Sequence, residues 1–143
     1  MLLEAAIQIA VQAHAGQKDK SGEPYILHPL RVMARLQTLE EKIVGVLHDV
    51  VEDTPWTPGR LKEQGFPDHI LEALDCVTKR DGEAYDDFVA RSASNPIAIR
   101  VKIADLEDNM DLRRLLHLTP KDHERLGKYL AAYHILLARL QSK

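Results

Sequence analysis

The stretch Leu39–Thr54, which reads LEEKIVGVLHDVVEDT, decides the fold that we expect for this chain. Its apolar residues leave almost no polar face, so the pattern predicts a helix over about 39–50 that is buried on all sides. A buried helix of this kind forms the centre of a bundle. The stretch nevertheless ends in HDVVED (48–53), and four titratable groups at the end of a buried helix are unfavourable unless a cation or another partner compensates them.

On both sides of this stretch, apolar residues recur at helical spacing, and prolines and glycines separate the segments. No segment shows the sustained apolar and polar alternation of a half-buried strand. We therefore predict an all-α fold, a compact multi-helix bundle. The expected helices cover about 3–14, 29–37, 39–50, 57–64, 67–80, 85–89, 96–110 and 120–140. In the last of them, five residues in steps of four and three are expected to face the core: Leu126, Leu130, Tyr133, Leu137 and Leu140.

Composition limits the class of protein. The chain has 143 residues, 45% of them hydrophobic, and a formal net charge of −3 from 19 Lys and Arg and 22 Asp and Glu. These values predict one globular domain with a single core and exclude a disordered chain. One cysteine excludes a disulfide scaffold and a cysteine-based zinc site. A mildly acidic chain also lacks the basic face that a nucleic-acid-binding protein usually carries.

The first sixteen residues, MLLEAAIQIAVQAHAG, are apolar enough to suggest a signal peptide. No basic residue precedes the apolar run, and Glu4, Gln8 and Gln12 form a polar stripe at helical spacing. This pattern indicates an amphipathic helix instead. No other segment approaches the roughly 20 apolar residues of a membrane-spanning helix. We therefore expect a cytoplasmic protein that binds neither a membrane nor nucleic acid.

Three separated segments place metal-ligand residue types in apolar surroundings. Asp105 continues the apolar stripe of the helix over 96–110, and His28 directly precedes the proline at the start of the helix over 29–37. Together with His48 and Asp49 they would make a set of two histidines and two aspartates. Mixed nitrogen and oxygen ligands suit Mn²⁺, Fe²⁺ or Zn²⁺.

Such an ion has two uses in phosphoester hydrolysis: it neutralises a phosphoryl oxygen, and it lowers the pKa of water. Glu52 and Asp53, one helical turn after the His-Asp pair, could then accept the proton of the water or hold the water in line. Each feature alone has a simpler explanation. A His-Asp pair is more often a helix-end hydrogen bond, and a buried Asp105 could pair with an arginine.

Four motifs occur in a fixed order: AHAGQ (13–17), KSGEPYILHP (20–29), HDVVEDT (48–54) and VKIADLEDNM (101–110). Together they resemble the hydrolase domain of RelA/SpoT proteins, a branch of the HD-domain metal-dependent phosphohydrolases. The resemblance spans roughly residues 3–140. It implies an all-α HD-domain bundle that removes pyrophosphate from the 3′ position of the stringent-response alarmones ppGpp and pppGpp. The implied cofactor is Mn²⁺, with Fe²⁺ or Zn²⁺ as further possibilities.

The resemblance also implies a role for individual residues. The implied metal ligands are His28, His48, Asp49 and Asp105. Glu52 and Asp53 resemble the pair that activates the water. The implied contacts to the nucleotide substrate are Lys20, Ser21, Tyr25 and Asn109, with Arg125 and Tyr129 at the phosphate end. Since 143 residues fit the hydrolase domain alone, we expect a stand-alone hydrolase over 1–143 without a synthetase or regulatory domain. The sequence predicts no oligomeric state.

Three departures from the family pattern are expected to lie around the substrate. Asp19 stands where an arginine is common, Leu106–Asp108 replaces Arg-Leu-His, and Leu112 replaces a threonine. They leave open a second hypothesis, an HD-domain phosphohydrolase for another phosphorylated nucleotide. A third hypothesis is a non-catalytic nucleotide-binding sensor, although the ligand and carboxylate sets are complete.

Overall fold

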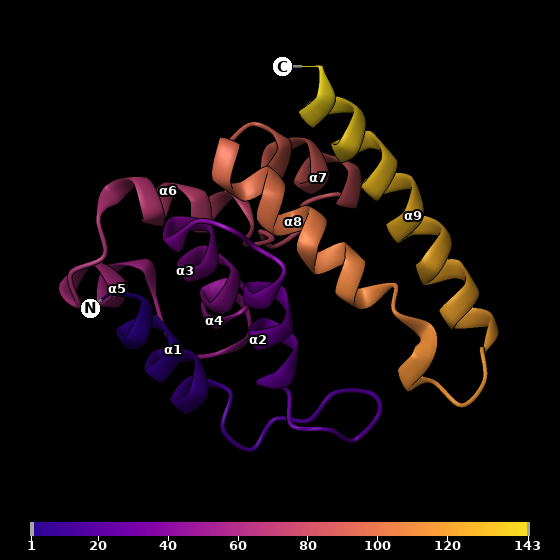
Figure 1. The fold of residues 1–143 in the computed structure, drawn as a ribbon, viewed down its shortest axis with the longest axis horizontal. Coiled ribbons are helices and arrows are strands. Elements are labelled where there is room, and N and C mark those ends of the chain that lie inside the picture. Colours follow the sequence, from indigo (N-terminus) through magenta and orange to yellow (C-terminus); the bar gives the residue numbers. More distant parts are fainter. Residues whose placement is uncertain (1, 143) are drawn as a thin grey trace.

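The computed structural model describes residues 2–142, and Figure 1 shows that helices make up most of this part of the chain. These residues form no β-strand, only an isolated antiparallel bridge between Lys18 and Pro24. The all-α prediction is therefore confirmed. In chain order the helices are α1 (Leu2–Ala13), α2 (Leu27–Ala34), α3 (Leu39–Leu47), α4 (Val50–Asp53), α5 (Pro58–Glu63), α6 (Asp68–Cys76), α7 (Tyr85–Ala93), α8 (Pro96–Asn109) and α9 (Pro120–Gln141), with a short 3₁₀ turn, η1 (Leu112–Arg114), before α9.

Four helix starts follow from local side-chain chemistry. The side chains of Thr38, Thr57, Asn95 and Thr119 each accept hydrogen bonds from backbone N–H groups in the first turn of the helix that follows. The second helix differs from the expectation, because α2 begins at Leu27, two residues before the proline. A proline in the first turn is tolerated there, since its missing N–H would have no partner within the helix.

Helix α3 is the centre of the first half of the molecule, as predicted. All five residues of Ile43–Leu47 are buried, and α1, α2 and α8 pack against this helix. Its contact with the end of α2 is close: a Cβ added to Gly45 would lie 3.5 Å from Cγ1 of Val32 and 2.6 Å from Cδ1 of Leu36, two residues after α2. The glycine thus allows the end of α2 to approach α3.

The predicted single helix over 39–50 is wrong at its end. Helix α3 stops at Leu47, and the one-turn helix α4 begins at Val50. Between them, the carbonyl of Gly45 accepts bonds from both the backbone N–H and the ring of His48, which tightens the last turn of α3. His48 and Asp49 therefore lie at a joint between two helices instead of on a continuous helical surface.

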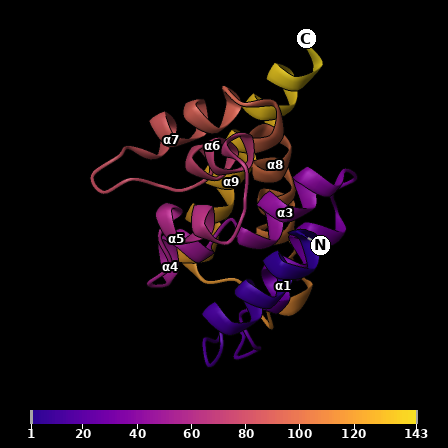
Figure 2. The ribbon, with the colours of Figure 1, turned by 90° about the vertical axis from the view of Figure 1, so that its left-hand side faces the viewer.

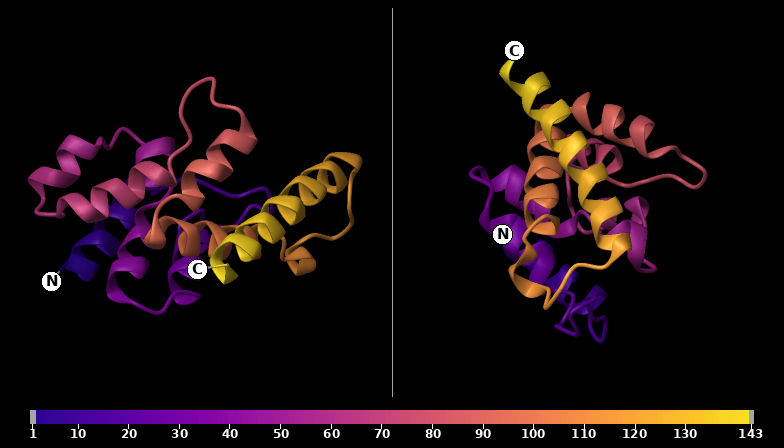
Figure 3. Two further views of the ribbon diagram at one scale, coloured as in Figure 1. Left: turned by 90° about the horizontal axis from the view of Figure 1, so that it is seen from above. Right: turned by 90° about the vertical axis from the view of Figure 1, so that its right-hand side faces the viewer.

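The second half of the molecule packs α7 and α9 on α8, and Figures 1 and 3 show α9 running beside α8. Helix α8 contributes to two hydrophobic clusters, one with α1–α3 and α6 and one with α7 and α9. In α9 the expected core stripe is confirmed only in part, because Tyr133 and Leu140 pack against the second cluster but are not fully buried. The buried positions are Ala132 and Leu136, whereas Leu130 is 50% exposed.

Two loops extend from the helices. Residues 14–26 extend below α1 and α2 in Figure 1, and residues 77–84 project between α6 and α7 in Figure 2. Across residues 2–142, no helix combines the length and the apolar character that crossing a membrane requires. The cavity described below opens between the first of these loops, the joint of α3 and α4, α8 and the beginning of α9.

Candidate active site

One cavity of about 590 Å³ collects every residue that the sequence singled out as a candidate site residue. These residues come from distant parts of the chain: the loop before α2, α2, the joint of α3 and α4, α4, α8 and α9. They are Lys20, Ser21, Tyr25, His28, His48, Asp49, Glu52, Asp53, Asp105, Asn109, Arg125 and Tyr129. The residue types predicted a shared site for the histidines and carboxylates, the family resemblance added the nucleotide contacts, and the individual roles stay predictions.

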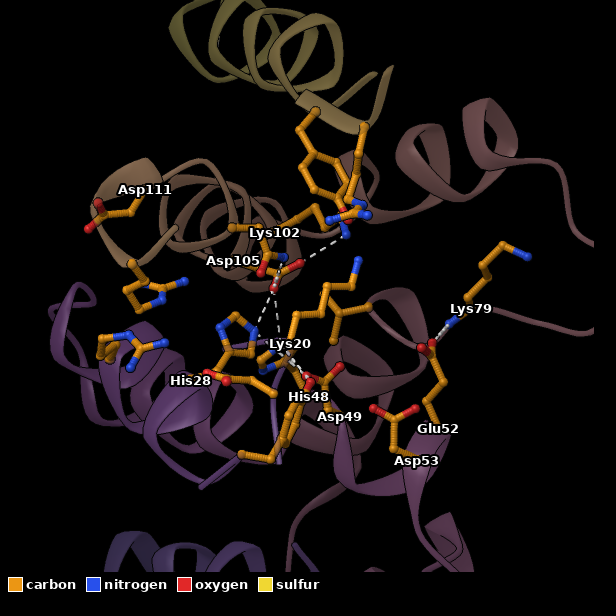
Figure 4. A pocket seen from close by; sticks show the side chains of 18 of the residues that line it. Lys20, His28, His48, Asp49, Glu52, Asp53, Lys79, Lys102, Asp105 and Asp111 are labelled. Atoms are coloured by element: carbon orange, nitrogen blue, oxygen red, sulfur yellow. Dashed lines mark hydrogen bonds and ion pairs between the residues drawn. The ribbon is translucent and has the colours of Figure 1, made fainter. Parts of the chain in front are cut away.

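The two histidines and two aspartates meet at the bottom of this cavity (Figure 4). Nε2 of His28 lies 3.0 Å from Oδ1 of Asp105. Nε2 of His48 lies 3.0 Å from Oδ2 of Asp49 and 3.3 Å from Oδ1 of Asp105. His28, His48 and Asp49 offer ligand atoms that all lie within 4.8 Å of one another. This is a separation that one metal ion could bridge.

The orientation of the His48 imidazole fits metal binding. Nδ1 of His48 lies 2.6 Å from the carbonyl oxygen of Gly45. A carbonyl can only accept, so Nδ1 carries the hydrogen and the lone pair of the neutral ring is on Nε2. That Nε2 is buried and makes no hydrogen bond, although two carboxylates lie close to it. A buried nitrogen lone pair among carboxylate oxygens is the donor set that a divalent transition metal prefers.

Electrostatics keeps this cluster charged in spite of its burial. Burial alone would raise the pKa of Asp105, but Lys102 and the two histidines hold that pKa well below its usual value. Burial also opposes charge on His48, and the carboxylates of Asp49 and Asp105 outweigh it and raise the pKa of the imidazole. The histidines and carboxylates therefore stabilise one another in their charged forms. A divalent cation could take the place of the protons that lie between them.

Two of the expected substrate contacts also hydrogen-bond to carboxylates of the cluster. The hydroxyl of Tyr25 donates to Oδ2 of Asp49 at 2.5 Å. Burial and this neighbouring carboxylate raise the pKa of the phenol, so it stays a donor. The amide of Asn109 donates to Oδ1 of Asp105 at 3.1 Å. Both side chains line the cavity, yet their polar atoms already orient candidate metal ligands.

Glu52 and Asp53 lie side by side at one edge of the cluster, on α4 (Figure 4). Oε1 of Glu52 accepts the backbone N–H of Lys79 at 2.8 Å, and the backbone carbonyl of Asp53 accepts the amide of Gln17 at 3.3 Å. Burial, with the nearby charge of Asp49, raises the pKa of both carboxyls. A raised pKa suits a carboxylate that accepts a proton from water.

The sequence analysis missed Lys102, which lies on α8 one turn before Asp105. Its ammonium is buried, lies 3.0 Å from Oδ2 of Asp105 and sits 4.8 Å from the ring centre of Phe88. Asp105 raises the pKa of Lys102 against the effect of burial, so the side chain is a cation within the cavity wall. The signal was a lysine three residues before a buried aspartate on an otherwise apolar helix.

Basic residues outnumber acidic residues in the wall of the cavity, although the chain as a whole carries a net charge of −3. Six of the lining residues are Asp or Glu and eight are Lys or Arg. The eight are Lys18, Lys20, Arg31, Lys79, Lys102, Arg114, Arg125 and Lys128. A bound divalent cation would add to this positive charge, so the cavity suits an anionic substrate rich in phosphate.

Two of the three family departures lie away from the cavity, contrary to expectation. The side chain of Asp108 is fully buried and lies behind His28, and Leu112 is 42% exposed but does not line the cavity. Asp19 does line it. However, Oδ1 of Asp19 accepts the backbone N–H groups of Ser21 and Glu23 at 2.9 and 3.0 Å, which closes a turn.

The chain belongs to the HD domain family, which it matches over residues 6–96. Among characterised proteins, it is 34% identical over 120 residues to a guanosine-3′,5′-bis(diphosphate) 3′-pyrophosphohydrolase of Aquifex aeolicus, covering 76% of this chain and 17% of that protein. It is 36% identical over 151 aligned positions to a GTP pyrophosphokinase of Streptomyces coelicolor, covering 96% of this chain and 18% of that protein. The chain thus spans about a fifth or less of the length of these relatives.

The fold also has a counterpart among solved structures. It superposes with a TM-score of 0.74 on a protein described as a metazoan ortholog of SpoT that hydrolyses ppGpp and plays a role in starvation responses. The two share 21% identity, and the match covers 95% of this chain and 85% of the other. The HD-domain bundle and the resemblance to RelA/SpoT proteins are thereby confirmed.

Proposed function

We propose that this chain hydrolyses the 3′-pyrophosphate of guanosine alarmones, converting ppGpp to GDP and pppGpp to GTP with release of pyrophosphate. One observation carries the proposal: a cluster of two histidines and two aspartates, with two further carboxylates beside it, lies at the bottom of a basic cavity. The names of the relatives supply the substrate class. A phosphate-rich nucleotide matches the positive wall in charge.

The metal would be held by His28, His48, Asp49 and Asp105, whose donor atoms already face one another. We propose Mn²⁺, with Fe²⁺ or Zn²⁺ as the ions that the same donor set would also accept. When bound, such an ion would polarise a phosphoryl oxygen and lower the pKa of water.

Glu52 and Asp53 would accept the proton of the attacking water. Their raised pKa values make them stronger bases than ordinary surface carboxylates. The water oxygen then bonds to the phosphorus nearest the ribose, the bond between that phosphorus and the 3′ oxygen breaks, and the 3′ oxygen takes up a proton. The products are pyrophosphate and the nucleoside 5′-diphosphate or 5′-triphosphate with a free 3′-hydroxyl.

The remaining predicted residues would hold the nucleotide. Arg125 lies near enough to Lys20 that its charge, after burial, lowers the pKa of the lysine. Two cations this close favour a phosphate group between them. We assign Ser21 and Tyr129, which line the same cavity, to contacts with the nucleotide.

The experiment is a panel of nucleotides incubated with the purified chain and Mn²⁺, with the products separated by ion-exchange chromatography. We expect ppGpp and pppGpp to give pyrophosphate in equal amount to GDP or GTP. Release of monophosphate, or faster turnover of nucleotides without a 3′-pyrophosphate, would favour the broader phosphohydrolase. Binding of ppGpp without any turnover would favour the sensor.

A further inference from the structure

We propose that Asp108 is a positioning residue that holds the imidazole of His28 with Nε2 directed at the metal. Its carboxylate Oδ2 lies 2.6 Å from Nδ1 of His28. This proposal depends on the proposed function only in that both require a metal ion bound at His28. The family resemblance implies a place near the substrate for Asp108 and not this role.

Helix α8 places two carboxylates on opposite sides of one ring. Asp105 and Asp108 are three residues apart, about one helical turn. Asp105 lies 3.0 Å from Nε2 of His28, and Asp108 lies 2.6 Å from Nδ1. The ring is therefore fixed at both nitrogens by the same helix, and its rotation about the Cβ–Cγ bond is restricted.

The environment of Asp108 keeps its carboxylate ionised although the side chain is fully buried. Nε and a terminal nitrogen of Arg31 lie 2.8 and 3.1 Å from its two oxygens. Arg35 and Arg114 lie at 3.8 and 3.7 Å. The guanidinium of Arg31 thus contacts both carboxylate oxygens, and this paired charge compensates for the burial of the ionised side chain.

An ionised carboxylate only accepts hydrogen bonds, so Nδ1 of His28 must carry the hydrogen. The lone pair of the neutral ring then belongs to Nε2, which points to the cluster. A carboxylate behind a metal-bound histidine also makes the ring a stronger donor. His48 has only a backbone carbonyl in the same position, so the two histidines are held by partners of different charge.

The main test is the metal affinity of the apoprotein, measured by titration with Mn²⁺ and electron paramagnetic resonance of the free ion. Asp108→Asn keeps the shape of the side chain and an acceptor oxygen but removes its charge. We expect it to weaken Mn²⁺ binding about 10- to 100-fold. The matched control is Asp68→Asn, an exposed aspartate paired with Lys62 far from the cavity, which should bind Mn²⁺ as the wild type does.

Kinetics separate positioning from a general loss of structure. In Asp108→Asn, a higher Mn²⁺ concentration should restore most of kcat, with the KM for ppGpp little changed. If kcat of Asp108→Asn is as low at saturating Mn²⁺ as at low Mn²⁺, the proposal is overturned. Wild-type protein that binds no divalent ion would overturn the proposed metal centre itself, whereas equal affinity of the wild type and Asp108→Asn would overturn only the role of Asp108.

A second measurement needs no variant and is independent of activity. In the wild type loaded with diamagnetic Zn²⁺, two-bond ¹H–¹⁵N correlation spectra report which ring nitrogen of each histidine carries hydrogen. We expect His28 with hydrogen on Nδ1 and none on Nε2. Hydrogen on Nε2 in the loaded protein would contradict the proposed orientation.

Discussion

Asp53 differs from Asp49 and Asp105 because its carboxylate oxygens accept no hydrogen bond and form no ion pair within residues 2–142, whereas those two carboxylates are held by several partners. Its raised pKa and its place beside the cluster suit a proton acceptor. We expect Asp53→Asn to lower kcat for ppGpp about 10²- to 10⁴-fold, the usual contribution of a positioned base. Steady-state kinetics at saturating Mn²⁺ measure this loss.

The control for Asp53→Asn is Asp87→Asn, an exposed aspartate on α7. It should keep the wild-type kcat and the wild-type melting temperature. Full activity of the Asp53 variant would rule out the proposed proton acceptor. A loss of Mn²⁺ binding equal to the loss of kcat would instead make Asp53 a metal ligand.

At the scale of single residues, the sequence predicted which residues line the cavity but not which of their atoms pair. The residue types and their order identified the members of the cavity, since histidines and carboxylates within apolar runs are unusual. The pairing of atoms was not predictable, because it depends on where distant segments meet. The hydroxyl of Tyr25 on Asp49 and the carboxylate of Asp108 on His28 join residues 24 and 80 positions apart.

At the scale of elements, the loop between α6 and α7 links stability to the candidate site. The guanidinium of Arg91 donates to the carbonyl oxygens of Asp75 and Thr78 and to both oxygens of Glu83. The same loop donates the N–H of Lys79 to Glu52. We expect Arg91→Ala to lower the free energy of unfolding by about 1–3 kcal/mol, from the lost charged hydrogen bonds, and to reduce kcat several-fold.

The control for Arg91→Ala is Arg80→Ala, in the same loop. Arg80 pairs with Asp75 at 2.9 Å, but both side chains are more than half exposed, and such pairs contribute little. Denaturant unfolding and kcat should both stay near wild type. If the two variants are equally stable, the bonds of Arg91 do not hold the loop.

Glu83, in the same loop, should make the stability of the protein depend on pH. The bonds from Arg91 lower the pKa of Glu83 to about 2, from 4.5. A lowered pKa means that the native state is stabilised at pH values above 4.5 and loses this stabilisation as the pH falls towards 2. The melting temperatures of wild type and Glu83→Gln should therefore differ at pH 6 and converge between pH 4.5 and 2. A constant difference down to pH 2 would contradict this assignment.

The errors in predicted elements have physical causes. The apolar run over 43–51 predicted burial correctly, but hydrophobic periodicity carries no information on the bond between the ring of His48 and the carbonyl of Gly45 that accompanies the end of α3. In α9, the leucines suggested one core face, whereas small Ala132 lies in the contact with α8. The choice of face depends on the shape of the neighbouring helices, which the pattern of α9 alone does not contain.

At the scale of the whole molecule, α9 connects the second hydrophobic cluster to the cavity. Leu136 is fully buried against α8, and residues earlier in α9, Arg125 and Tyr129, line the cavity. We expect Leu136→Ala to destabilise the protein by about 2–5 kcal/mol through the cavity that it leaves. The KM for ppGpp should rise as α9 loosens, while the affinity for Mn²⁺, whose candidate ligands lie on other elements, should change little.

Leu130→Ala is the matched control because Leu130 is 50% exposed on the same helix. Its effect on the free energy of unfolding should stay within about 0.5 kcal/mol. Calorimetry and urea unfolding measure both variants. An effect of Leu130→Ala as large as that of Leu136→Ala would mean that the original stripe of leucines, and not Leu136, packs α9 in solution.

The proposed metal centre would join elements from both halves of the molecule, since its candidate ligands come from α2, the joint of α3 and α4, and α8. An ion that binds only the native state stabilises all of it at once. At 100 times its dissociation constant it should add about 2.7 kcal/mol and raise Tm by roughly 5–10 °C. Differential scanning fluorimetry with Mn²⁺ should show this rise in Tm, and a chelator should reverse it. The control variant His69→Gln, which changes an exposed histidine, should show the same rise. His48→Gln should lose the rise, and a rise that persists in that variant would place the bound ion elsewhere.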